Sequence, residues 1–282
     1  MPLPRSIAPA LACIALTVPS LAQSVTLPSV KDNTLYEDAL GALSNGAGTG
    51  IFVGRVGNIG GTEIRRGLLR FNPVASIPVG STITAVTLRL YMNKTMAGAK
   101  SIALHRTLAD WGEGTSVGEG SGALATPNDA TWIHRFYNNT LWSTPGGNFA
   151  PMPSAATSVA AAGFYEWSGP GLIADVQAWL DNPATNFGWT LLGDESTPQT
   201  AKRFASREWF FVNERPALLI DFTPPTPACY PDCDLDGGLT IDDFICFQTL
   251  FALNDPAADC DADTTLTIDD FICFQTLFAI GC

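Results

Sequence analysis

The chain has 282 residues, 46% of them hydrophobic, and a formal net charge of −12 at pH 7. A nucleic-acid-binding surface needs a basic face, so this charge argues against that class of partner. The acidity is also uneven. From Thr223 onward there are eleven Asp and no Lys, Arg or His, whereas residues 23–222 carry sixteen acidic and fourteen basic residues. We therefore expect the tail to bind cations.

Residues 1–22 are predicted to be a secretory signal peptide. Arg5 precedes an apolar stretch of small and aliphatic residues, and Ser20-Leu21-Ala22 is a small-x-small cleavage site. A buried first helix and a lipid anchor on Cys13 are the alternatives. No later apolar run approaches the roughly 20 residues that a membrane span needs. We therefore expect a soluble, exported chain, secreted or held at the cell surface.

Residues 23–222 are predicted to form one mainly β domain, a jelly-roll-like β-sandwich. Short strand-like runs are separated by Gly, Pro and Asn clusters, which is typical of sandwiches and jelly rolls. In the run TITAVTLRLY, residues 82–91, alternation places Ile83 on the face of Arg89 and Leu88 on the opposite face. The other predicted strands include RGLLRF from Arg66, KSIALHR from Lys100, FGWTLLGD from Phe187 and ALLIDF from Ala217.

One segment of this domain has helical rather than strand periodicity. In GLIADVQAWLDNP, which ends at Pro183, apolar residues recur at helical spacing, at Leu172, Ile173, Val176, Trp179 and Leu180. Proline cannot continue a helix, so we predict a short helix or helical turn that ends before Pro183 and lies across a sheet edge.

Three tryptophans are candidates for glycan binding. Trp111, Trp132 and Trp142 lie in a Gly-, Asn- and Pro-rich stretch that predicts long loops. Exposed aromatic rings stack on the apolar faces of sugars, with polar neighbours fixing the orientation. The alternative for each is packing in the core or against a loop. Trp179 and Trp189 are predicted to be core residues.

Catalytic signatures are sparse, so we expect no enzymatic activity. The two histidines, His105 and His134, each lie in a strand-like run beside an Arg, and no G-x-S-x-G or H-E-x-x-H motif is present. A pair of carboxylates for glycan cleavage stays open, with Glu113, Glu119, Glu166 and Asp175 as candidates. Loop carboxylates are also candidates for a structural calcium site, namely Asp32, Glu37, Glu113 and Asp129.

The segment TPPTPACYP, residues 223–231, is predicted to be a stiff linker. The remainder, residues 232–282, contains two copies of one unit, residues 232–253 and 259–280. Over 22 aligned positions, 18 are identical. The second copy begins 27 residues after the first. We predict a small all-α domain made of two calcium-binding loop–helix units.

Each copy begins with a spacing of oxygen-bearing residues that suits Ca²⁺. A loop around this ion takes ligands from positions 1, 3, 5, 7, 9 and 12 and needs a sharp turn at position 6, usually at Gly. The predicted ligands of the first loop are Asp232, Asp234, Asp236, the Gly238 carbonyl, Thr240 and Asp243. Those of the second loop are Asp259, Asp261, Asp263, Thr265, Thr267 and Asp270. A solvated acidic turn is the alternative.

The second loop departs from the first at position 6, where Thr264 replaces Gly237. Because a β-branched residue resists a positive φ, we expect this loop to be strained or rearranged and to bind Ca²⁺ more weakly. Crowded carboxylates repel one another without a cation, so folding of the tail is expected to depend on metal.

The run TIDDFICFQTLFA that follows each loop is apolar almost all round. Such a helix is expected to be buried, and we predict two of them packed together, with some apolar surface left for a partner.

Six cysteines in this short segment predict a disulfide framework, since a domain this small buries little surface. Without a CxxC pair or a His, zinc binding is disfavoured. Cys229 and Cys282 flank the repeats and are placed to join their ends. The other four, Cys233, Cys246, Cys260 and Cys273, pair either within each copy or across the two copies.

With these motifs, residues 229–282 resemble a dockerin of the exported bacterial kind that ends in Gly-Cys. The resemblance implies a module that inserts into a receptor module, the cohesin. In dockerins the residues at loop positions 10 and 11 help to choose the partner. They correspond here to Ile241 and Asp242 and to Ile268 and Asp269. The chain departs from the cellulosomal pattern in its cysteines, in Thr264 and in these isoleucines.

Residues 24–222 resemble the DNRLRE family, β-sandwich modules of exported bacterial proteins, some of which bind carbohydrate. The resemblance is carried by several short stretches, including KDNTLYE from Lys31, RRGLLRFNP from Arg65, LADWGEGTS from Leu108, PNDATWIHRF from Pro127 and NFGWTLLGDE from Asn186. It implies a non-catalytic binding or surface module.

The sequence therefore predicts a glycan-binding or surface-display domain, held on a larger assembly by a calcium-dependent, dockerin-like tail. A structural spacer or matrix component without a small ligand is the first alternative. A polysaccharide-degrading enzyme is the second.

Overall fold

The computed structural model describes residues 22–57, 60, 63–225, 229–234, 236–261 and 263–281. The predicted signal peptide, apart from Ala22, lies outside these residues. The chain divides into two compact units, one spanning Leu21–Pro225 and the other containing Thr226–Cys282. The division lies inside the segment predicted to be a linker. Each unit is described by itself.

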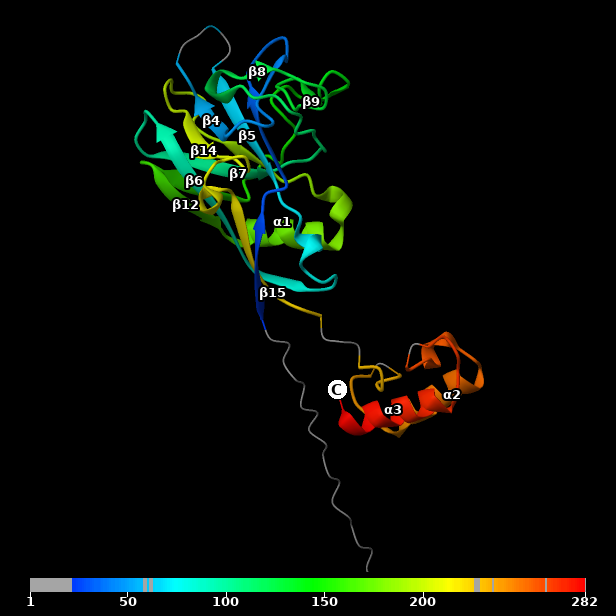
Figure 1. Ribbon diagram of the computed structural model, residues 1–282. Coiled ribbons are helices and arrows are strands. Elements are labelled where there is room, and N and C mark those ends of the chain that lie inside the picture. The colour runs from blue at the N-terminus through cyan, green and yellow to red at the C-terminus, as the bar shows by residue number, and fades with distance from the viewer. Residues whose placement is uncertain are drawn as a thin grey trace, which may run out of the picture. The chain divides into compact units, whose positions relative to one another are not determined.

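The first unit is mainly β, as predicted, and is built on one curled antiparallel sheet (Figure 1). Its strand order is β1-β15-β6-β14-β4-β5-β13-β7-β11, with β12 paired to β6 and β2 paired to β5. The strands are β1 (Gln23–Pro28), β2 (Lys31–Tyr36), β4 (Gly50–Arg55), β5 (Ile64–Arg70), β6 (Thr82–Thr95), β7 (Lys100–Arg106), β11 (Ala155–Val159), β12 (Gly163–Ser168), β13 (Trp189–Leu192), β14 (Lys202–Ala205) and β15 (Ala217–Thr223). Among the described residues, two small antiparallel pairs accompany this sheet, β3 (Leu43–Ser44) with β8 (Ala123–Leu124) and β9 (His134–Phe136) with β10 (Thr140–Leu141).

Curling of the sheet brings distant strands together around one hydrophobic core. Trp167 on β12 donates its indole N–H to the carbonyl of Ile102 on β7, at 2.8 Å. Trp179 and Trp189 are buried, with ring centroids 4.6 Å apart, so their predicted place in the core is confirmed.

The predicted helix is also present, as α1 (Pro170–Asp181). Pro170 lies at its first turn, where the missing N–H costs nothing, and Asn182 follows its last residue. Leu172, Val176 and Trp179 face the core. The helix packs against β6 and against the short 3₁₀ helix η1 (Pro73–Ala75).

A β-bulge changes one predicted side-chain orientation. Alternation placed Ile83 on the face of Arg89, opposite to Leu88, but Ile83 and Leu88 are both buried in the core. The pairing of β15 with β6 shifts between Asp221 and Phe222, because Asp221 lies opposite Ala85 whereas Phe222 lies opposite Ile83. The extra residue in β6 reverses the alternation beyond it. The prediction that Ile83 and Leu88 lie on opposite faces was therefore wrong.

The second unit consists of two helices, α2 (Ile241–Ala252) and α3 (Ile268–Ile280), joined through the 3₁₀ helix η5 (Pro256–Ala258). Its core is aromatic: the rings of Phe247 and Phe274, at equivalent positions of the two copies, stack with centroids 4.1 Å apart. Disulfides join Cys233 to Cys246 and Cys260 to Cys273.

The two disulfides decide between the pairings left open by the sequence, because each lies within one copy and joins its loop to its helix. Cys229 is disulfide-bonded as well. Its predicted partner, Cys282, lies outside the described residues. Disulfides are typical of oxidising, non-cytoplasmic compartments. Across the residues that the structure describes, no helix is long and apolar enough to cross a membrane.

The prediction that the tail helices are buried was wrong for one face of each. Phe247 and Phe274 are buried, but Ile241 is 69% exposed and Ile268 is 68% exposed. Ile245 and Ile272, one turn further along each helix, are exposed too. A unit of two helices and one short connection has too little material to cover both faces of each helix.

Candidate functional site

Each tail loop brings three aspartate side chains together. One carboxylate oxygen from each of Asp232, Asp234 and Asp236 lies within 4.8 Å of the others. The equivalent residues of the second loop, Asp259, Asp261 and Asp263, form the same arrangement. Each group of three carboxylates offers oxygen donors, which are the ligands that Ca²⁺ prefers.

Hydrogen bonds from the loop backbone hold these carboxylates in place. In the first loop, Asp236 N–H donates to Asp234 (3.1 Å), Gly237 N–H to Asp232 (3.1 Å) and Gly238 N–H to Asp236 (2.8 Å). The other oxygen of Asp232, Oδ1, is buried and has no hydrogen-bond partner. A buried, unpaired carboxylate oxygen is costly, so the donor set fits a cation.

Crowding of the carboxylates alters their pKa values. At Asp234 a hydrogen bond from Asp236 N–H lowers the pKa, but desolvation and the neighbouring carboxylates outweigh it and raise the pKa above its ordinary value. At Asp261, desolvation and the adjacent carboxylates likewise raise the pKa. Repulsion between the carboxylates in both loops therefore favours either protonation or a bound cation.

The predicted twelfth-position ligands, Asp243 and Asp270, are buried, and each caps the helix in whose first turn it lies. Asp243 accepts the N–H of Thr240 at 2.8 Å, and Asp270 accepts that of Thr267 at 2.7 Å. Burial raises the pKa of Asp243, but hydrogen bonds from backbone N–H groups, chiefly those of Thr240 and Asp234, outweigh it and hold the pKa below its ordinary value.

Neither Asp243 nor Asp270 belongs to the group of three oxygens in its loop. Thr240 and Thr267, predicted as ligands, are the N-cap residues whose hydroxyls accept the N–H of Asp242 and Asp269. In the second loop, Thr265 donates its N–H and its hydroxyl to Asp263. Coordination by these residues and by the Gly238 carbonyl stays a prediction.

The second loop retains the fold of the first despite the substitution at position 6. Thr264 has a φ of +71°, and Gly237 has a φ of +86°. Thr264 N–H donates to Asp259 at 2.9 Å, as Gly237 N–H does to Asp232. The predicted strain at Thr264 is therefore present, because a β-branched residue occupies the left-handed region.

The predicted partner-contacting residues are all exposed. Ile241 and Asp242 form the first turn of α2, and Ile268 and Asp269 form that of α3. Ile241 with Ile245, and Ile268 with Ile272, form two equivalent apolar faces, one on each helix.

The predicted glycan-binding tryptophans are not exposed platforms. Trp111 and Trp142 are buried, and their indole N–H groups donate to the carbonyls of Phe187 and Thr131. Trp132 is partly buried beneath the guanidinium of Arg66, 4.8 Å from the ring centroid. The glycan-binding prediction was wrong for Trp111 and Trp142. The Gly-rich loops fold back over these rings and form a second small core with Leu35, Leu68 and Ala130.

Among the carboxylates considered for structural calcium, Asp32 and Glu113 meet around Arg207. Asp32 accepts the Arg207 backbone N–H, and Glu113 pairs with its guanidinium at 2.8 Å. Glu37 accepts the backbone N–H of Glu63, and Asp129 accepts that of Thr126 in its own loop. In the described part of the first unit, no three such side chains form a metal-sized group.

The residues considered for catalysis are engaged in structural contacts, with the exception of Glu166, which is exposed. Glu119 forms an ion pair with Arg203, and Asp175 accepts the indole N–H of Trp189. His105 is buried against the carbonyl of Ala150, and His134 contacts the hydroxyl of Thr131. The absence of enzymatic activity stays a prediction.

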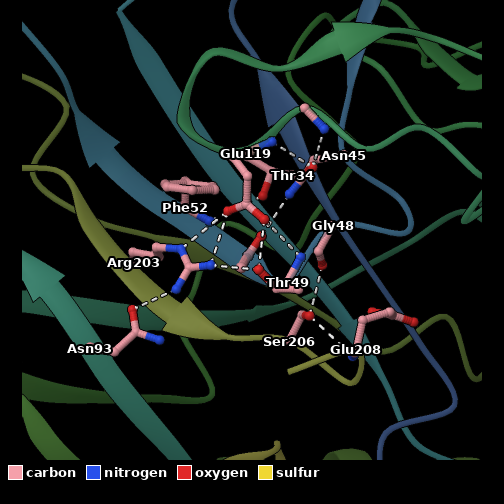
Figure 2. A network of polar contacts seen from close by, with 12 residues as sticks. Thr34, Asn45, Gly48, Thr49, Phe52, Asn93, Glu119, Arg203, Ser206 and Glu208 are labelled. Atoms are coloured by element: carbon pink, nitrogen blue, oxygen red, sulfur yellow. Dashed lines mark hydrogen bonds and ion pairs between the residues drawn. The ribbon is translucent and has the colours of Figure 1, made fainter. Parts of the chain in front are cut away.

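Sequence reasoning missed a hollow of about 670 Å³ in the first unit. Strands β4, β6 and β14 form its floor, and the loop between β14 and β15 forms one wall. Figure 2 shows the polar network on this floor, centred on Arg203 and Glu119. The wall carries Trp209, Phe210 and Phe211. One signal in the sequence could have pointed to this wall. The apolar run WFFV, residues 209–212, lies between Glu208 and Glu214 and does not alternate as a strand does.

No protein-family model matches this chain, and a search of curated proteins found no significant match.

Proposed function

We propose that this protein is an exported, non-catalytic binding protein. Its first unit, a jelly-roll-like β-sandwich in this proposal, binds a glycan or serves surface display. Its second unit is a calcium-dependent, dockerin-like anchor that inserts into a cohesin-like receptor. The observation that carries the proposal is the duplication in the tail, where each copy combines three clustered aspartates with an exposed apolar helix face.

The loops support the calcium part of the proposal. Asp232, Asp234 and Asp236 would hold one ion, and Asp259, Asp261 and Asp263 would hold the other. Bound Ca²⁺ neutralises the repulsion among these carboxylates and thereby stabilises the loops. Each loop is joined to its helix by a disulfide and by a capping aspartate, so order in the loop is transmitted to the helix.

The exposed helix faces support the docking part. Ile241 and Ile245 on α2 are matched by Ile268 and Ile272 on α3. Exposed apolar patches flanked by polar residues are typical of protein-interaction sites. Asp242 and Asp269 follow the first isoleucine of each face and supply the polar residue beside it. Because the two faces have the same residues, we infer that either one is able to dock.

Calorimetric titration of Ca²⁺ into the chain from residue 23 onward, with its disulfides formed, tests this proposal. We expect two binding events, one lost in Asp234→Ala and the other lost in Asp261→Ala. Alanine removes the carboxylate oxygens that would hold the ion. The matched control is Asp242→Ala, which removes an exposed carboxylate outside the cluster and should retain both events.

The outcomes separate the parts of the proposal. A single event, lost only in Asp234→Ala, would mean that the strained second loop does not bind Ca²⁺. Heat changes that persist in both variants would place the ion elsewhere. No binding in the wild-type chain would overturn the calcium-dependent anchor.

A further inference from the structure

The loop between β14 and β15 holds three apolar side chains in solvent. Phe210 is 74% exposed, Phe211 is 61% exposed and Val212 is 72% exposed. A contiguous apolar run of this kind is uncommon on the surface of a monomeric protein and marks an interaction site.

This loop is fixed by its own hydrogen bonds. Trp209 N–H donates to the Ser206 carbonyl at 3.1 Å, and the Arg215 guanidinium donates to the Trp209 carbonyl at 2.7 Å. The Trp209 indole N–H donates to Glu214 at 2.6 Å. The turn that follows, η4 (Val212–Glu214), starts directly after Phe211. The loop backbone and the Trp209 ring are therefore in a defined place before any ligand binds, which lowers the entropic cost of binding. The rings of Phe210 and Phe211 contact the Trp209 ring, with centroids 5.4 Å and 6.3 Å away.

The floor of the hollow is polar and equally well fixed. The Arg203 guanidinium donates to Thr49 (2.8 Å), Asn93 (2.9 Å) and Glu119 (2.9 Å), as Figure 2 shows. The same guanidinium lies 4.9 Å from the ring centroid of Trp209. It therefore links the polar floor to the aromatic wall.

Charges around the hollow are balanced. Arg203 and Lys94 contribute two positive charges, and Glu119 and Glu214 contribute two negative ones. Desolvation raises the pKa of Glu119, but hydrogen bonds from Thr49 and Arg203 outweigh it and hold the pKa below its ordinary value. Glu119 is therefore ionised and neutralises Arg203. A polyanion would find no excess of positive charge here, and a purely apolar ligand would leave charged groups desolvated.

We propose that this hollow is the glycan-binding site of the first unit and that it takes a neutral polysaccharide. Phe210 and Phe211 offer ring faces for the apolar faces of the sugar rings. The side chains of Asn93, Lys94 and Glu214 line the hollow and offer hydrogen-bonding groups to sugar hydroxyls. The volume of about 670 Å³ lies within the range of small-ligand sites. This inference rests on the proposed glycan binding of the unit and names its location and ligand class.

The test is affinity electrophoresis of the full chain from residue 23 onward in gels that contain single polysaccharides. The neutral panel is xylan, mannan, pullulan and hydroxyethyl cellulose, and the acidic panel is alginate and polygalacturonate. We expect retardation by at least one neutral polysaccharide and at least a tenfold loss of affinity in Phe210→Ala and in Phe211→Ala. Both residues are exposed, so these variants should fold. Val79→Ala removes an equally exposed apolar side chain from another loop and should bind like the wild type.

Each contrary result has a distinct meaning. If the wild type binds and both Phe variants bind equally well, the hollow is not the site, although glycan binding stands. Binding to the acidic panel alone would overturn the neutral class. A wild-type chain that binds no polysaccharide would overturn the glycan-binding function as well. Self-association that Phe210→Ala abolishes, without polysaccharide binding, would make this surface a contact between copies of the chain.

Discussion

At the scale of single residues, the two tail copies differ in the backbone strain at Thr264. It has a φ of +71°, and the first loop has Gly237 at +86°. A non-glycine residue in this region costs on the order of 1–3 kcal/mol. Space is not the cause, since a Cβ added to Gly237 would meet nothing within 4 Å.

We therefore expect Thr264→Gly to strengthen Ca²⁺ binding at the second loop by about 1 kcal/mol, or roughly fivefold. Gly237→Ala is the matched reverse change and should weaken the first loop by a similar amount. Calorimetric titration of each variant measures both effects. Equal Ca²⁺ affinities for the wild type and Thr264→Gly would show that backbone strain does not limit the second loop.

Asp32 is a residue whose ionisation opposes folding. It is buried and accepts the Arg207 N–H at 2.8 Å. Burial, followed by the nearby carboxylate of Glu208, raises its pKa well above the ordinary value. The folded chain therefore keeps this proton at pH values where the unfolded chain, with a pKa of about 3.9, has lost it. The stability contributed by Asp32 is present at low pH and is lost as the pH rises through the folded-state pKa.

Asp32→Asn mimics the protonated carboxyl at every pH. We expect the free energy of unfolding of the wild type to fall relative to that of Asp32→Asn as the pH rises from about 4 toward neutrality. Urea unfolding of both proteins along this pH series measures the difference. A difference that stays constant with pH would mean that the Asp32 pKa is the same in the folded and unfolded states.

At the scale of elements, each tail copy is held together by a disulfide between its loop and its helix. Cys233 and Cys246 are 13 residues apart and join the first loop to α2. The carboxylate cap on the same helix, from Asp243, makes a second link between loop and helix.

We expect the double variant Cys233→Ser, Cys246→Ser to lose about 3 kcal/mol of tail stability, the value for a loop of this length. Ca²⁺ binding at the first loop should weaken, while the second loop, stapled by Cys260 and Cys273, should be unaffected. Chemical unfolding and calcium calorimetry measure the two effects. Equal losses of Ca²⁺ affinity in both loops would mean that the copies fold as one cooperative element.

At the scale of the whole molecule, the stabilising features are divided between the two units. The first unit has the large hydrophobic core and no cysteine between residues 23 and 228. The second has a small aromatic core, its disulfides and the aspartate clusters.

We therefore expect two transitions in scanning calorimetry of the full chain. EDTA should lower only the tail transition, because a ligand at about 100 times its dissociation constant contributes about 2.7 kcal/mol per site. A reducing agent should likewise leave the transition of the first unit unchanged. One transition that shifts as a whole under EDTA would contradict this division.

The sequence by itself determined the features that depend on neighbouring residues. The duplicated tail, the two acidic loops and the helix of residues 170–181 follow from local spacing, capping and periodicity, which are short-range effects. The positive φ expected at Thr264 follows from the same local comparison with Gly237.

Only the tertiary structure decided the features that depend on distant contacts. Ile83 turns inward because of a bulge against β15, and Trp111 is buried because a loop folds back over it. Lys202 is fully buried because its ammonium group donates to acceptors in two distant turns, such as the Gly98 and Ala160 carbonyls. The hollow beside Phe210 joins segments more than a hundred residues apart, and local sequence patterns contain no information about such proximity.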